Sequence, residues 1–149
     1  MLMVNSTTER PIALANDLRP VLLRLTRELR RETEQFGITG RQATLLWLVK
    51  GSPGLTLRAL AEMEGISPPA LSGHIDRLER SGLLVRVRST DDRRRVGLEL
   101  TEEGDRILRS VRERRTAWLA GRLGALDPTE LEAVSAAVEP LRQLLQVKA

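Results

Sequence analysis

The 149-residue sequence contains no cysteine and no tyrosine, and its only histidine is His74. Without cysteine the chain can form no disulfide, thiolate metal site or thiol nucleophile, and it cannot sense oxidants through a thiol. A single histidine leaves no histidine-rich zinc site and no support for a serine–histidine–aspartate arrangement. We therefore expect that the protein is not an enzyme, that it has no catalytic residues and that it binds no metal and no cofactor. The lack of disulfides is compatible with a cytoplasmic location, which we expect.

Aromatic residues are also scarce, since Phe36, Trp47 and Trp118 make up only 2% of the chain. Hydrophobic residues nevertheless reach 41%, so the core must be aliphatic, and the many leucine, alanine, glutamate and arginine residues favour helices. No apolar run reaches the roughly 18 residues of a membrane span, and we expect no membrane partner. Residues 1–10 lack the pattern of a secretory signal.

The basic residues are almost all arginine, which supplies 22 of the 24, and the net charge is +4. Arginine binds phosphate bidentately and stays charged at any working pH. The excess of positive charge therefore mildly favours an anionic partner.

Regular apolar spacing predicts helices on both sides of a central segment. The N-terminal stripe steps by three and four residues and consists of Leu14, Leu18, Val21, Leu25 and Leu29. Residues 1–10 are polar and expected to be flexible, and Pro20 predicts a kink or a late helix start near residues 16–19. Thr39 and Gln42 form a capping-box pair at the start of another helix, and Thr101 and Asp127 are typical N-cap residues of two more.

The central segment predicts two short helices joined by a tight turn. Thr56 is typical of a helix N-cap, and Gly65 suits a turn that needs a positive φ. Ser67 caps the second helix, and two prolines follow it in the first turn, where a missing backbone donor costs least. The inward face of this helix is expected at Leu71, Ile75 and Leu78.

After Gly82 the period changes from helical to two, which predicts a β-hairpin with one apolar face. The alternating apolar positions are Leu83, Val85 and Val87, then Val96, Leu98 and Leu100. The loop between the strands is long and highly charged. Seven arginines and three acidic residues between Arg77 and Arg95 give this stretch a net charge equal to that of the whole chain, +4.

The predicted fold class is mainly α with a small β-hairpin, a winged helix-turn-helix with a helical dimerisation region. In such a unit the second helix enters the major groove of DNA and its first residues lie at base edges. An ordinary surface helix in an α+β domain is the alternative, but the basic loop beside the helix favours DNA, because arginines at a loop tip can contact phosphate or the minor groove.

Two segments resemble the MarR family of bacterial transcriptional regulators. The stretch from Asp92 to Thr101 (DRRRVGLELT) is similar to the family's D-x-R…L-T signature, and residues 67–83 (SPPALSGHIDRLERSGL) resemble its recognition helix. The resemblance extends over residues 12–146 and implies a homodimeric regulator that binds a pseudo-palindromic operator. We expect this regulator to be a repressor. The expected division of the chain is a flexible segment (residues 1–10), a helical dimerisation region (11–36 and 102–146) and a winged helix-turn-helix DNA-binding domain (37–101).

The resemblance also implies roles for individual residues. Arg94 is expected to enter the minor groove, and Asp92 to orient the wing by pairing with an arginine. Contacts mainly to phosphate are implied for Ser67, Ser72, Arg77 and Arg86. The expected DNA-binding residues also include Pro68, Pro69 and Gly73 on the exposed face of the helix and Arg93 and Arg95 at the loop tip. Gly73 stands where many relatives carry arginine or another long side chain, which removes one groove contact.

Similar proteins bind small aromatic or phenolic effectors, and we expect such a ligand between the dimerisation helices and the winged unit, near Arg24, Trp47 and His74. Simpler interpretations remain open for these residues. A lone histidine is more often hydrogen-bonded packing, and Trp47 and Trp118 can simply fill the core or a dimer interface. The rival function is a winged-helix protein–protein interaction module without specific DNA binding.

Overall fold

The structure is a computed structural model that describes residues 6–88, 91 and 96–147. Within these ranges it contains six helices and one antiparallel hairpin. The elements are α1 (Ser6–Glu34), α2 (Gly40–Gly51), α3 (Leu57–Glu64), α4 (Pro68–Arg80), β1 (Leu84–Arg88), β2 (Val96–Leu100), α5 (Glu102–Leu123) and α6 (Pro128–Leu144). The predicted fold class is confirmed. Asp92, Arg93, Arg94 and Arg95 lie outside the described residues.

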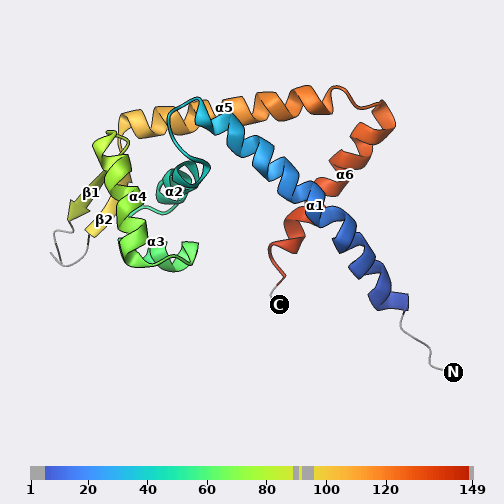
Figure 1. The fold of residues 1–149 in the computed structure, drawn as a ribbon, viewed down its shortest axis with the longest axis horizontal. Coiled ribbons are helices and arrows are strands. Elements are labelled where there is room, and N and C mark those ends of the chain that lie inside the picture. The colour runs from blue at the N-terminus through green and yellow to red at the C-terminus, as the bar shows by residue number, and fades with distance from the viewer. Residues whose placement is uncertain (1–5, 89–90, 92–95, 148–149) are drawn as a thin grey trace.

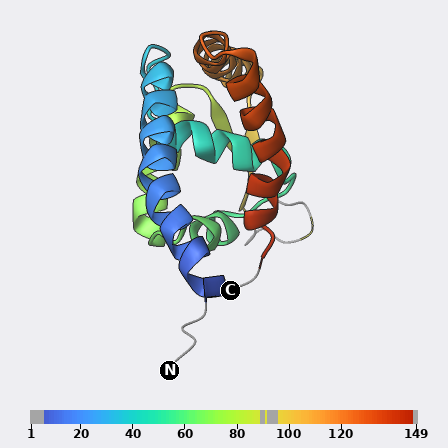
Figure 2. The ribbon, with the colours of Figure 1, turned by 90° about the vertical axis from the view of Figure 1, so that its right-hand side faces the viewer.

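The elements divide the molecule into a compact end and an open end. Helices α2, α3 and α4 and the hairpin gather at one end, and α1 and α5 run out from it (Figure 1). Helix α6 folds back from the far end of α5. It crosses α1 in Figure 1 but lies on the opposite side of the molecule in Figure 2, so the two helices do not pack together.

The hydrophobic core lies in the compact end. Its most deeply buried side chains come from α2, α3, α4, both strands and the first half of α5, and they are Leu45, Leu46, Leu60, Leu71, Ile75, Leu78, Leu84, Leu98 and Val111. Helix α6 buries no residue at all. The winged unit is therefore the part that a single chain can stabilise by itself.

Local signals set most helix boundaries. The capping box of Thr39 and Gln42 is present at the start of α2, and Thr56 and Ser67 accept backbone hydrogen bonds at the starts of α3 and α4. Gly65 ends α3 with φ 63°, a left-handed conformation that glycine adopts without steric cost. These predictions are confirmed.

The start of α1 differs from the prediction. The helix begins at Ser6 and continues through Pro11 and Pro20, so residues 6–10 are helical and the late start expected near residues 16–19 is wrong. The kink expected at Pro20 stays a prediction. A proline removes one backbone donor, but good helix formers on both sides, such as Leu18 and Leu22, support the neighbouring turns.

The hairpin is confirmed, but the inward face of its first strand is not the predicted one. Val85 and Val87 are exposed, and Leu84 is the fully buried residue of β1. The pairing places Arg86 opposite Leu98, on the same face as Leu84. Leu83 and Leu84 are both buried because the chain passes directly from the turn after α4 into the strand. The alternation of buried and exposed side chains in β1 therefore starts at Leu84, one residue later than the apolar pattern indicates.

A close approach joins the base of the hairpin to α5. The Thr101 hydroxyl donates to the carbonyl oxygen of Gly82 at 2.5 Å and accepts from the backbone N–H of Gly104 at 2.9 Å. A Cβ atom on Gly104 would lie 1.9 Å from the carbonyl oxygen of Leu83. Only glycine therefore allows α5 to pack this closely against the turn after α4.

Polar contacts attach α1 to α5. Arg115 of α5 donates to the hydroxyl of the fully buried Thr33, at 2.6 Å from Nη2, and to the carbonyl oxygen of Leu29 at 3.1 Å. Arg114 pairs with Glu32 at 2.7 Å. These contacts fix the C-terminal third of α1, whereas its N-terminal part extends away from the core (Figure 1).

Candidate nucleic-acid interface

Helix α4 presents its N-terminus on the molecular surface. The Ser67 hydroxyl accepts from the backbone N–H of Ala70 at 3.3 Å, and Pro68 and Pro69 occupy the first helical positions. All four residues are exposed. The unsatisfied N–H groups and the helix dipole of such an end favour a nearby anion such as phosphate.

Buried side chains fix the orientation of α4. Leu71, Ile75 and Leu78 are each at most 1% exposed and anchor one face of the helix in the core. Arg77 is exposed on the outer side, and Ser72 and Gly73 are half-buried. A Cβ atom on Gly73 would meet nothing within 4 Å, so this position has open space where many relatives are expected to carry a long side chain.

Arg86 connects β1 to α4. Its Nη2 donates to Asp76 Oδ1 at 2.7 Å, its Nη1 donates to Glu79 Oε1 at 3.1 Å, and its backbone N–H donates to Glu79 Oε2 at 3.3 Å. The hydrogen bond to Asp76 is the largest cause that raises the pKa of Arg86. The family resemblance implied a phosphate contact for Arg86 and no role for the two acidic residues, although their spacing of three places them on one helix face.

Three further arginines are exposed on the two elements that Arg86 connects. Arg77 and Arg80 are exposed at the end of α4, and Arg88 is exposed on the face of β1 that also carries Arg86. Arg80 donates from Nε to the carbonyl oxygen of Asp76 at 3.3 Å. Helix α4 and the first strand of the hairpin are thus joined through Arg86, with three exposed arginines on the same two elements.

A pocket of about 360 Å³ lies between α2 and α5. Trp47, which is 55% exposed, forms part of its apolar wall. Two arginines, Arg112 and Arg115, also line it. Burial, together with the charge of Arg30, lowers the pKa of Arg115 from its usual value. An apolar wall beside two cations fits a small organic anion.

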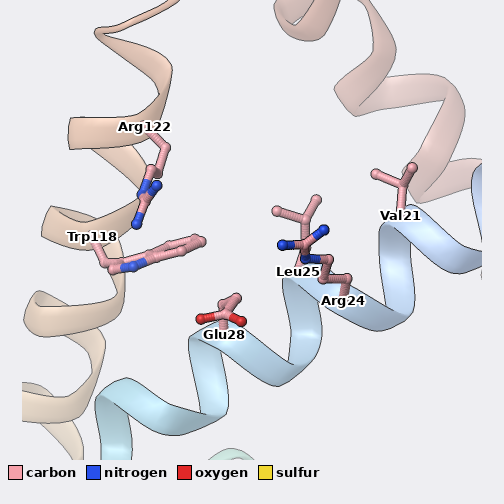
Figure 3. A pocket seen from close by; sticks show the side chains of 6 residues that line it. All are labelled: Val21, Arg24, Leu25, Glu28, Trp118 and Arg122. Atoms are coloured by element: carbon pink, nitrogen blue, oxygen red, sulfur yellow. The ribbon is translucent and has the colours of Figure 1, made fainter.

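A second pocket, of about 500 Å³, lies between α1 and α5 toward the open end. Figure 3 shows Arg24 and Glu28 on α1 facing Trp118 and Arg122 on α5 across this space. The guanidinium of Arg122 stands over the indole ring of Trp118, 5.1 Å from its centroid, in a cation–π arrangement.

The structure separates the three residues predicted to share an effector pocket. Arg24 lines the α1–α5 pocket, Trp47 lines the α2–α5 pocket, and His74 lines neither. His74 lies on α4, and its Nδ1 atom is buried without a hydrogen-bond partner within the described part of the chain. Neither of these two pockets brings the three residues together, and an effector site that they share stays a prediction.

The fold and this surface define a class of protein, the winged-helix DNA-binding proteins. The family model for the MarR family matches residues 36–95, which include α2, α3, α4 and β1. The chain is 33% identical over 114 residues to the HTH-type transcriptional repressor MdtR of Bacillus subtilis, covering 76% of this chain and 74% of that protein. It is 29% identical over 132 residues to an uncharacterized HTH-type transcriptional regulator of Mycobacterium bovis, covering 89% and 92%.

A solved structure agrees with these relatives. A MarR family protein from Bacillus stearothermophilus superimposes with a TM-score of 0.79 and 28% identity, covering 93% of this chain and 98% of the other. The chain belongs to the MarR family of transcriptional regulators, as the sequence analysis predicted. It is a DNA-binding transcriptional regulator and not an enzyme. Within the described residues, no helix is long and apolar enough to cross a membrane.

Proposed function

We propose that the protein is a cytoplasmic homodimeric repressor that binds a pseudo-palindromic operator and is released by a small organic ligand. The observation that supports operator binding best is the exposed N-terminus of α4 on a helix whose other face is anchored in the core. Binding there would block access of the polymerase to a promoter. Two such helices in a two-fold dimer would lie about one DNA turn apart, roughly 34–36 Å.

The exposed apolar residues of the open end support a dimer. They lie on α1 and α6, both of which a single chain leaves largely uncovered, and include Ile12, Leu14, Val21, Leu23, Leu131, Val134, Val138 and Leu144. Apolar stripes of this length are stable in water only when they are covered. A second copy of the chain, packed through the same helices, would cover them.

Arg94 and Asp92 retain the roles implied by the family signature, namely minor-groove insertion and orientation of the wing. Arg94→Ala should weaken operator binding by roughly 1–3 kcal/mol if the side chain reads the minor groove. The fold should remain intact, since exposed charges contribute little to stability. Unchanged affinity in a gel-shift titration would exclude this role.

The experiment that tests the proposed function is selection of bound sequences from a pool of random DNA with the purified full chain. A two-fold symmetric consensus with half-sites about one turn apart supports the proposal. Recovery of no consensus, with affinity that hardly changes with salt, supports the rival interaction module instead, because phosphate contacts make affinity fall steeply as salt rises.

The effector is assigned to the α2–α5 pocket, since its apolar wall and two arginines suit an aryl carboxylate. Salicylate is a suitable probe. Its binding can be followed by intrinsic fluorescence, because Trp47 and Trp118 are the two tryptophans of the chain. A fluorescence change that disappears in Trp47→Phe and persists in Trp118→Phe, together with weaker DNA binding, would support this site, because a ligand affects DNA only through different affinities for the two states. The reverse pattern would move the site to the α1–α5 pocket.

A further inference from the structure

The link between Arg86 and α4 accounts for two acidic residues on a helix that must approach DNA. Asp76 and Glu79 each place a negative charge beside the expected position of the phosphate backbone, where they oppose binding. Both carboxylates instead face Arg86 on the neighbouring strand, at 2.7 and 3.1 Å. The Arg86 side chain is 27% exposed, less than either of its partners.

The geometry points to Arg86 as a positioning residue that fixes the wing against the recognition helix, and not as a phosphate ligand. We refer to Arg86, Asp76 and Glu79 together as the α4–β1 clamp. Its three hydrogen bonds use both terminal nitrogens of the guanidinium and the backbone N–H of the same residue. A phosphate at this guanidinium would have two carboxylates as neighbours, so the local charge of the cluster, one positive and two negative, would repel it.

Such a clamp matters because α4 and the wing contact different parts of DNA at the same time. The inference rests on the proposed mode of operator binding, in which the helix occupies the major groove and the wing lies over the adjacent minor groove. If the two elements already have the correct spacing, binding does not have to pay for ordering one against the other. The fixed planar fork of arginine can hold two carboxylates at once, which a lysine ammonium on a flexible stem cannot do with the same geometry.

The test uses the duplex recovered from the random pool and measures affinity at several salt concentrations. Arg86→Ala and Asp76→Ala should each weaken binding by about tenfold, the usual effect of losing a charge-assisted hydrogen bond, with an unchanged salt slope. Arg88→Ala is the matched control, because Arg88 is exposed on the same strand face and has no ion pair within the described residues. If Arg88 contacts phosphate, its removal should reduce the salt slope by about one.

Asp76→Ala distinguishes the clamp from a simple charge effect. Removal of a negative charge near DNA would raise affinity if Arg86 were a phosphate ligand, since it would also free that guanidinium. Binding that becomes tighter in Asp76→Ala, a lower salt slope in Arg86→Ala, or full activity in Arg86→Lys would each overturn the inference. In the double variant the two losses should not add, because they break the same contact.

Failure of the inference and failure of the proposed function give different results. If the wild-type chain binds no duplex, the proposed mode of DNA binding is wrong. If it binds and the clamp variants retain full affinity, only the role of Arg86 is wrong. Circular dichroism at the assay temperature shows that each variant is folded, so that lost binding reports positioning and not unfolding.

Discussion

At the scale of single residues, the fit between α5 and the winged unit depends on one position without a side chain. Gly104 lies in the first turn of α5, where Thr101 caps the helix and also donates to Gly82 at the end of α4. This contact places the base of the hairpin directly against α5. The distance allows no Cβ atom, so the position is set by packing and not by a backbone conformation that only glycine adopts.

Gly104→Ala should lower the free energy of unfolding by about 1–3 kcal/mol or more, since the carbonyl of Leu83 would have to move to admit the methyl group. Gly51→Ala is the matched control, because a Cβ atom there meets nothing within 4 Å. It should leave stability unchanged or raise it by up to about 1 kcal/mol. Urea denaturation of both variants is the measurement, and equal stability of the two would contradict the close approach.

At the scale of elements, helix caps and links between helices place the surface that is proposed to contact DNA. The cap of α4 has two possible roles, since Ser67 satisfies a backbone donor and also stands where a phosphate is expected. Links from α5 to α1 and α2 then hold the winged unit at the end of the long helices. The two roles of Ser67 can be separated by a substitution that keeps the helix cap and changes the affinity for phosphate.

Ser67→Asp should separate capping from phosphate binding. Aspartate is as good an N-cap as serine, so the free energy of unfolding should stay close to that of the wild type, whereas Ser67→Ala should lose about 1 kcal/mol. The added negative charge should nevertheless weaken DNA binding, because it repels phosphate. Thermal denaturation and gel-shift titration together test this prediction. Full DNA affinity in Ser67→Asp would exclude Ser67 from the interface.

The link between Lys50 of α2 and Asp105 of α5 should make stability depend on acidity. The hydrogen bond from Lys50, and after it that from Arg109, lowers the pKa of Asp105 below its usual value of 3.8. A lowered pKa in the folded state stabilises the fold above the pKa of the unfolded chain, and this contribution disappears as the pH falls through the folded value.

Lys50→Met should therefore lose less stability than the wild type when the pH falls from neutral to below the usual aspartate value. Arg58→Met is the control, because it removes an ion pair with Glu62 that is almost fully exposed on α3. The control should follow the wild-type pH dependence. Urea denaturation at a series of pH values provides the comparison, and identical acid profiles for Lys50→Met and the wild type would contradict the role of this link.

At the scale of the whole molecule, the division into a compact end and an open end separates the surface proposed to contact DNA from the surface proposed to form the dimer. The core of the winged unit is complete within one chain, whereas α6 buries nothing and most of α1 is exposed. The two helices lie on opposite sides of the molecule in Figure 2. The proposed second copy would cover their exposed apolar faces and set the separation of the two recognition helices.

Val138→Asp should disrupt the dimer, since it places a charge on the exposed apolar face of α6 that the partner is proposed to cover. The variant should scatter light as a monomer at micromolar concentration and bind the operator weakly. Met63→Asp is the matched control, because Met63 is similarly exposed, at 54%, but lies on α3 in the winged unit. A dimeric Val138→Asp, or a monomeric wild type, would refute the proposed assembly.

The sequence by itself determined the order and the type of the elements and their family. Helix caps act through contacts within three or four residues, so Thr39, Thr56, Ser67 and Asp127 could be read directly. The inward face of α4 followed from its helical period, and the basic stretch around the hairpin followed from composition. Each of these properties depends on neighbours in the chain, which the sequence contains explicitly.

Only the tertiary structure decided which residues meet across elements. Val85 has the apolar character of a core residue, yet Leu84 is buried, because the α4 turn and not the hydrophobic pattern sets the phase of β1. Arg24 and Trp47 belong to separate pockets because α1 diverges from α2. Arg86 has the same side chain as its exposed neighbour Arg88, but the turn after α4 brings it beside two carboxylates, ten and seven residues earlier in the chain. Such contacts depend on the packing of distant segments, and no local pattern specifies them.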